Sequence, residues 1–171
     1  MTEYNDIYDK DRNLTGRVHL RGTRWKKGEY GLVACVWVYD GRGNILLTRR
    51  APEKSGAGSW ENSGGAVKAG ETSLEGVSRE LFEETGIWAE GDRFKLLGSK
   101  RDGNTHYDHY CLMADVPLER IVLLPGETDA AQWASFEKVH AMIDSGQIHP
   151  VIARQFLKYE PELLLRQTAQ W

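Results

Sequence analysis

Three glutamates, Glu80, Glu83 and Glu84, are spaced three and four residues apart. On a helix this spacing places all three carboxylates on one face, where like charges repel one another. Such a face suits a divalent cation, because Mg²⁺ is commonly held by a few carboxylates together with the phosphate oxygens of a substrate. An isolated E-x-x-E-E pattern could equally be the solvated acidic face of a surface helix, so the flanking residues decide between the two readings.

The flanking residues predict a helix with both ends marked. Thr72 and Glu75 have the spacing of a capping box, and Gly86 stands where a left-handed C-terminal cap would lie. An apolar stripe runs beside the acidic face and would pack on a core; its members are Leu74, Val77 and Leu81.

From Gly65 the chain reads GAVKAGETSLEGVSRELFEETGI. It matches G-x5-E-x7-R-E-U-x-E-E-x-G-U, with U apolar, at Gly65, Glu71, Arg79, Glu80, Leu81, Glu83, Glu84, Gly86 and Ile87. This segment resembles the Nudix box, and a match at every fixed position distinguishes it from a chance acidic helix.

The resemblance implies an α/β fold, the Nudix-type α/β/α sandwich, with a mixed β-sheet and a loop–helix–loop motif. It implies Mg²⁺-dependent hydrolysis of the diphosphate bond in a nucleoside diphosphate linked to another group, with Mn²⁺ as a substitute. The expected metal ligands are Glu80, Glu83 and Glu84, with the carbonyl of Gly64 as a further one.

The resemblance also suggests roles for the neighbouring residues. Arg79 would pair with a box glutamate and orient it, and Glu71 would support the loop; Arg79, Glu83 and Glu84 form the expected catalytic set. The acceptor of the water proton is left open between Glu83 and Glu127, a loop residue that we assign to the metal.

Outside the box the evidence is weaker. Arg49 and Arg50 end a predicted strand and could hold a substrate phosphate, although a solvated strand end explains them equally well. We interpret His106 and His109 as surface or hydrogen-bonding residues.

The remaining elements must form the scaffold. Alternating apolar runs and turn residues predict strands and helices without a regular βαβ period, which favours a mixed sheet packed between helices. The pattern predicts a hairpin of 31–39 and 44–50, a second strand pair of 94–100 and 107–116, a strand at 130–134, and helices at 136–145 and 151–159.

Length and composition fit a single domain, which we place at 30–165, preceded by an N-terminal extension or small hairpin at 1–29. Trp25 and Tyr30 in or beside this segment could stack on a base or simply pack. Cys35 and Cys111 lie in apolar runs and are expected to be buried and reduced.

The net charge of −3 provides no basic stripe for polymeric nucleic acid. The chain also has neither a long apolar run nor a basic, apolar leader, so we expect a cytoplasmic protein with no membrane partner and a small-molecule diphosphate as substrate. A homodimer would be the commonest assembly.

Two alternatives accompany the hydrolase. The segments TGRVHLRG and ILLTRRAPEKSGAGSWENSGG are similar to isopentenyl-diphosphate isomerase, but this chain has Gly31, Gly64 and Ala66 where that enzyme carries histidine, cysteine and histidine. The other is a non-catalytic nucleotide-binding sensor domain, a class that often lacks box carboxylates, whereas this chain retains them all.

Overall fold

The fold is built around strand β3 (Gly31–Tyr39) in a computed structural model that describes residues 2–168. Side chains of β3 alternate between two core clusters. Ala34 and Val36 enter one cluster, whereas Trp37 and Tyr39 enter the other. A strand buried on both faces reads as a nearly continuous apolar run, which is why its alternation is not visible in the sequence.

Seven strands form a mixed sheet in the order β5-β4-β3-β8-β7, with β6 also pairing β3 and β9 also pairing β4. β8 runs parallel to β3 and the other pairs are antiparallel. The remaining strands are β4 (Asn44–Arg50), β5 (Trp60–Glu61), β6 (Ser63–Ala66), β7 (Lys95–Asp102), β8 (Thr105–Met113) and β9 (Thr128–Ser135). The predicted mixed sheet is confirmed, and so is the strand pair predicted at 94–100 and 107–116, which forms as β7 and β8.

The predicted hairpin of β3 and β4 forms only at its turn. Asp40 accepts hydrogen bonds from the amides of Arg42 and Asn44, and the only backbone pair between the two strands is Tyr39 with Ile45. Beyond it the strands separate, because β3 pairs with β6 while β4 pairs with β9. Pairing with distant strands therefore overrides the local hairpin.

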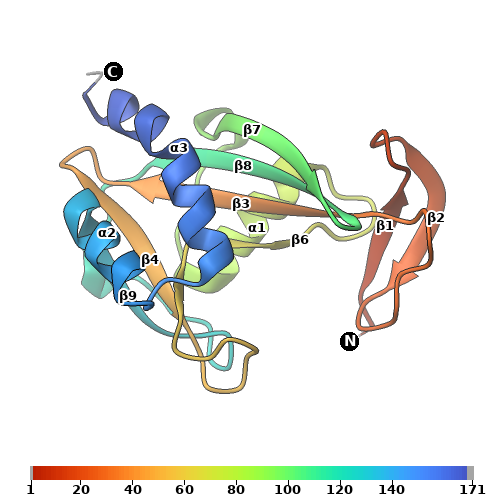
Figure 1. The fold of residues 1–171 in the computed structure, drawn as a ribbon, viewed down its shortest axis with the longest axis horizontal. Helices are drawn as coiled ribbons and strands as arrows, with labels where there is room; N and C mark the ends of the chain where they lie inside the picture. The colour runs from red at the N-terminus through yellow and green to blue at the C-terminus, as the bar shows by residue number, and fades with distance from the viewer. Residues whose placement is uncertain (1, 169–171) are drawn as a thin grey trace.

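Helices cover both faces of the sheet (Figure 1). α1 (Ser73–Thr85) packs into one core cluster, and α2 (Phe136–Asp144) and α3 (Pro150–Thr168) pack into the other. Short 3₁₀ turns lie at Gly91–Arg93 and Leu118–Arg120. The expected α/β/α sandwich is confirmed, but α3 is longer than predicted: it continues past Pro161 and buries Leu163 in the core.

The N-terminal residues form a separate two-stranded sheet of β1 (Tyr4–Tyr8) and β2 (Leu14–Leu20), which projects beside the main sheet (Figure 1). Arg12 in its turn donates to Asp108 on β8 at 2.6 Å, and the amide of Ala69 donates to the carbonyl of Tyr4 at 2.8 Å. The hairpin is thus attached to the loop before α1.

Both cysteines are buried and free. Within residues 2–168, no helix is long and apolar enough to cross a membrane.

Candidate active site

Helix α1 has the caps that its sequence predicts. The Thr72 hydroxyl accepts from the amide of Glu75 at 3.2 Å, and the Glu75 carboxylate accepts from the amide of Thr72 at 2.7 Å. Gly86 has φ 72° and donates to the carbonyl of Phe82 at 2.8 Å. Two strong end signals and the buried Val77 and Leu81 fix which face of the helix points away from the core.

Arg79 joins the loop to the acidic face. Its guanidinium donates to Glu71 at 2.7 and 3.0 Å, to Glu80 at 2.7 Å and to Glu83 at 3.2 Å. A further bond at 3.1 Å reaches the carbonyl of Ala66 on β6. Burial alone would lower the pKa of Arg79, but Glu71 and Glu80 hold it above its ordinary value.

Glu71 lies on the loop side of this network. Its carboxylate also accepts from the amide of Lys68 at 2.9 Å. Although burial opposes it, bonding to Arg79 and to the Lys68 amide lowers the pKa of Glu71. These contacts are those of a residue that shapes the loop before α1.

The glycine pair at 64–65 allows a close approach of β6 to its neighbours. A Cβ on Gly65 would lie 2.5 Å from the Glu80 carboxylate carbon. A Cβ on Gly64 would lie 2.6 Å from the carbonyl oxygen of Ala34 and 2.7 Å from the Cα of Cys35. The first contact explains why Glu80 can reach β6, and the second leaves no room for a cysteine at position 64.

Glu84 is half-buried and pairs with no basic side chain in the described chain. Burial, reinforced by the nearby Glu80 and Glu61, raises the pKa of Glu84 to about 8, against smaller opposing contributions from the Ser63 hydroxyl and the Gly64 amide. Burial likewise raises the pKa of Glu80. Glu84 therefore keeps a proton up to about pH 8 unless a bound cation takes over the compensation that no basic side chain of the described residues supplies.

A hollow of about 190 Å³ gathers most of the predicted site: Arg79, Glu80, Glu83, Glu84 and Glu127 all line it. The same wall contains Glu3, Arg21 and Lys68, so five carboxylates face three basic side chains. Sequence reasoning missed these last three, because they approach from the N-terminal hairpin and the loop after β6.

The donor set of this hollow fits a divalent cation, since carboxylate oxygens in excess over basic groups are the ligands that Mg²⁺ or Mn²⁺ takes. Within residues 2–168, no three acidic, histidine or cysteine side chains are already grouped around one point for a metal. Glu80 and Glu83 are turned toward Arg79 instead, and Glu127 pairs with Lys54.

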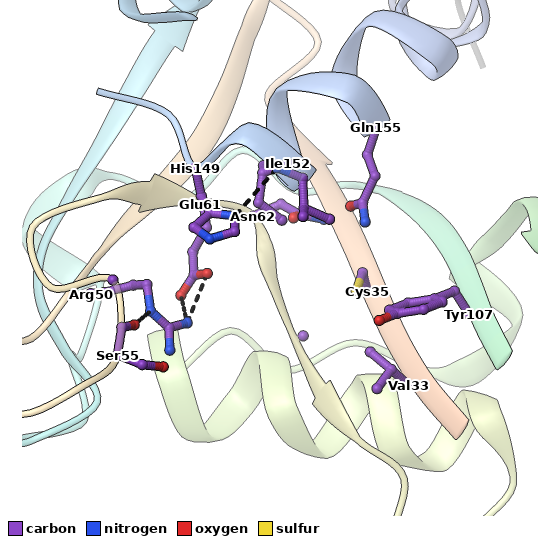
Figure 2. A pocket seen from close by; sticks show the side chains of 13 residues that line it. Val33, Cys35, Arg50, Ser55, Glu61, Asn62, Tyr107, His149, Ile152 and Gln155 are labelled. Carbon is purple, nitrogen blue, oxygen red and sulfur yellow. Dashed lines mark hydrogen bonds and ion pairs between the residues drawn. The ribbon is translucent and has the colours of Figure 1, made fainter. Parts of the chain in front are cut away.

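A larger pocket of about 430 Å³ lies on the α3 side of the sheet and adjoins the acidic site at Gly64 and Glu61. Figure 2 shows Arg50 bonded to Glu61 on one side of it, and Cys35 and Tyr107 on the other. Arg50 donates to Glu61 at 2.7 Å and to the carbonyl of Ser55 at 2.7 Å. Glu61 is a half-buried carboxylate whose pKa is raised by burial, and the sequence analysis did not single it out.

Arg49 does not line either hollow. Its guanidinium donates to Asp129 at 2.7 Å and lies 5.7 Å from the ring centre of Trp60. The two adjacent arginines thus differ in their surroundings, because successive side chains of a strand point to opposite faces of the sheet.

The interpretation of His106 and His109 as surface residues is wrong, since both are buried. The ring of His106 bonds to the carbonyl of Asp9 at 2.9 Å, which confirms a hydrogen-bonding role there. His109 has no partner at either ring nitrogen among the described residues, and burial lowers its pKa to about 4.

Comparison with known proteins agrees with this geometry. The model of the NUDIX domain matches residues 29–156. An uncharacterized Nudix hydrolase of Listeria monocytogenes is 30% identical over 155 residues, which cover 85% of this chain and 87% of that protein. This chain belongs to the Nudix hydrolase family.

Solved structures share the fold. A crystal structure from Deinococcus radiodurans matches with a TM-score of 0.76 at 22% identity and covers 91% of this chain and 98% of that one. A bifunctional NMN adenylyltransferase/ADP ribose pyrophosphatase of Francisella tularensis, in complex with AMP and a Mn ion, matches with a TM-score of 0.64 at 19% identity. That alignment covers 82% of this chain and 43% of the bifunctional protein.

Proposed function

We propose that this protein hydrolyses the diphosphate bond of a nucleoside diphosphate linked to a second group, and that Mg²⁺ is its cofactor. The observation that carries the proposal is Glu84, a half-buried carboxylate without a basic partner in the described chain, beside Glu80 and against the Gly64–Gly65 segment. A carboxylate in this setting is stabilised when a cation binds.

Glu80, Glu83 and Glu84 would hold the metal, joined by Glu127 from the facing loop of the same hollow. The carbonyl of Gly64, whose amide lies against Glu84, would be a further ligand. When bound, a divalent cation neutralises diphosphate charge and acidifies a coordinated water. Mn²⁺ would substitute, as the Mn ion in the Francisella relative suggests.

The side chains of this protein supply the remaining functions. Arg79 restricts Glu80 to one orientation from a loop that Glu71 braces. Glu83 and Glu127 are both within the hollow and are the two candidates for accepting the proton of the attacking water. The second terminal nitrogen of Arg50 has no acceptor among the described residues, so Arg50 could donate to a phosphate from the larger pocket.

The 430 Å³ pocket would take the nucleoside. Its wall combines Tyr107, which can pack against a flat ring, with the amides of Asn62 and Gln155. The side-chain oxygens of both amides are buried and have no partner in residues 2–168. Rotation of either side chain would bring its unpaired oxygen to the pocket, as an acceptor for the ring N–H or amino groups of a base.

The test is turnover with Mg²⁺ on a panel of nucleoside diphosphate derivatives, measured as release of monophosphate products. Glu84→Gln should lower kcat by roughly 100-fold or more, because it removes charge from the metal face. Glu90→Gln, at an exposed carboxylate beyond the helix, is the matched control. Near wild-type turnover by E84Q would contradict the metal assignment, and binding without turnover across the panel would favour the sensor alternative.

A further inference from the structure

A second cavity, also of about 190 Å³, lies between the N-terminal hairpin and the start of β3. Its wall includes Arg21, which also lines the acidic hollow, and Val33, which also lines the 430 Å³ pocket. The cavity therefore adjoins both parts of the proposed active site. The function proposed above does not use it.

Two nearly buried polar residues open into this cavity. Asn5 is 6% exposed, and its amide nitrogen donates to the carbonyl of Val67 at 2.8 Å, which fixes the side chain. Asn5 lines the cavity, and no donor among residues 2–168 is bonded to its side-chain oxygen. His19 is also 6% exposed, and the one hydrogen bond of its ring within residues 2–168 is a long one of 3.5 Å to the Thr23 hydroxyl.

An aromatic pair completes the wall. The rings of His19 and Trp25 stack with centroids 3.7 Å apart and planes 12° from parallel. Trp25 fits against Gly31, where a Cβ would lie 2.9 Å from its ring. This is the position at which the isomerase would carry a histidine, so the glycine there makes room for the tryptophan.

The chemistry of this wall selects a ligand class. An amide oxygen and a ring nitrogen can accept from hydroxyl groups, and an indole ring packs against the C–H face of a sugar. Arg21 donates one terminal nitrogen to Glu3, and the other can donate to a phosphate toward the acidic hollow. A volume of 190 Å³ equals the share of roughly six water molecules in the liquid, at about 30 Å³ each. This is the size of a single sugar ring.

We propose that this cavity binds the sugar on the second phosphate of a nucleoside diphosphate sugar, so that the substrate spans the acidic hollow with its nucleoside in the larger pocket. The proposal rests on the proposed hydrolase function and specifies its substrate class. It assigns the N-terminal hairpin to substrate recognition.

The test compares two substrates that share the diphosphate: a nucleoside diphosphate ribose, and the same nucleoside diphosphate with a methyl group on its terminal phosphate. His19→Phe keeps the aromatic stack and removes the ring nitrogens, and Trp25→Ala removes the platform. Each should raise KM about tenfold for the ribose compound, the loss expected for one or two hydrogen bonds or an equivalent contact. KM for the methyl compound should not change.

Val18→Ala is the matched control, because Val18 is adjacent to His19 in sequence and is 53% exposed. It should leave both KM values unchanged. The proposal would be overturned if a variant shifted KM equally for the two substrates, or if H19F left KM for the ribose compound unchanged. If the variants raised KM for a dinucleoside diphosphate but not for the ribose compound, the occupant of the cavity would be a base, and the proposal would also be overturned.

A binding experiment separates this proposal from the hydrolase function. If wild-type protein cleaves neither compound, the proposed function fails, but titration calorimetry with ribose 5-phosphate still examines the cavity. A sugar site is supported if H19F weakens the affinity for ribose 5-phosphate about tenfold and V18A leaves it unchanged. Equal binding by wild type and H19F, or no binding to wild type, contradicts it.

Discussion

Arg79 donates to Glu80, its neighbour in the helix, at 2.7 Å. Adjacent helical residues do not normally face each other, and the contact forms because the guanidinium is held on its other edge by Glu71. Glu80 is thereby held at β6 in advance of any ligand, which links the loop before α1 to the orientation of the metal face.

Arg79→Lys should therefore reduce activity although it preserves the charge. Lysine cannot donate along two edges as the guanidinium does, so we expect kcat to fall roughly 10- to 100-fold. Steady-state kinetics and the affinity for Mg²⁺ measure the effect. Arg154→Lys, at an exposed helical position, is the control, and equal activity of the two variants would refute the positioning role.

The metal-free protein should become less stable as the pH rises from about 4.5 to about 8. In this window the folded state keeps a proton on Glu84 that the unfolded state releases, because the folded pKa is raised from 4.5 to about 8. The contribution of Glu84 to the unfolding free energy is fully present below pH 4.5 and is lost as the pH rises through about 8. Melting temperatures in EDTA should show the decline.

Saturating Mg²⁺ should remove much of this decline, and Glu84→Gln should reduce it in the metal-free protein. Some slope should persist in E84Q, since Glu80 and Glu61 have pKa values raised in the same direction. An unchanged slope in E84Q would show that Glu84 does not titrate as described.

The buried His109 should give the opposite pH dependence of stability at acidic pH. Its pKa is lowered from 6.5 to about 4, so the unfolded state binds a proton that the buried ring refuses between these values. Stability should fall by up to about 3 kcal/mol as the pH drops through this window. His109→Phe should remove the acid-dependent loss, as urea unfolding at pH 5 and pH 7.5 would reveal; an equal loss in the variant would exclude His109 as the source.

The two glycines at 64 and 65 should respond differently to alanine. In Gly64→Ala the new methyl meets backbone atoms of β3, so we expect a loss of about 1–3 kcal/mol in unfolding free energy. In Gly65→Ala it meets only the end of the Glu80 side chain, which can move, so stability should change less and kcat should fall. Denaturant titration and kinetics of both variants check this, and the reverse ranking would contradict it.

The sequence allows helix α1 to be predicted almost to the residue, because its caps are encoded by residues within the helix and at its ends. The separation of β3 from β4 could not be anticipated, because it depends on β6 and β9, whose positions relative to the hairpin are set by tertiary contacts. Burial of His109 was missed for the same reason: Tyr159, 5.0 Å from its ring, comes from the far end of the chain.

The shared face of the carboxylates on α1 was predicted from their spacing, the helix caps and the match to the box, but their surroundings were not. Arg50 was left open between a phosphate ligand and a solvated strand end, and nothing near it in sequence indicates that Glu61 occupies part of its guanidinium. Arg21 and Lys68 likewise reach the acidic hollow from segments whose polar composition carries no site pattern.

The divergence of β3 and β4 after a single backbone pair has an evolutionary consequence. The acidic helix α1 packs against β6 and β3, whereas the 51–59 loop, which contributes Ser55 and Gly56 to the 430 Å³ pocket, extends from β4. Insertions or exchanges in that loop can therefore alter which molecule is recognised while the three carboxylates on α1 keep their positions. Proteins with this scaffold can thus change their substrate through a loop at one edge of the sheet.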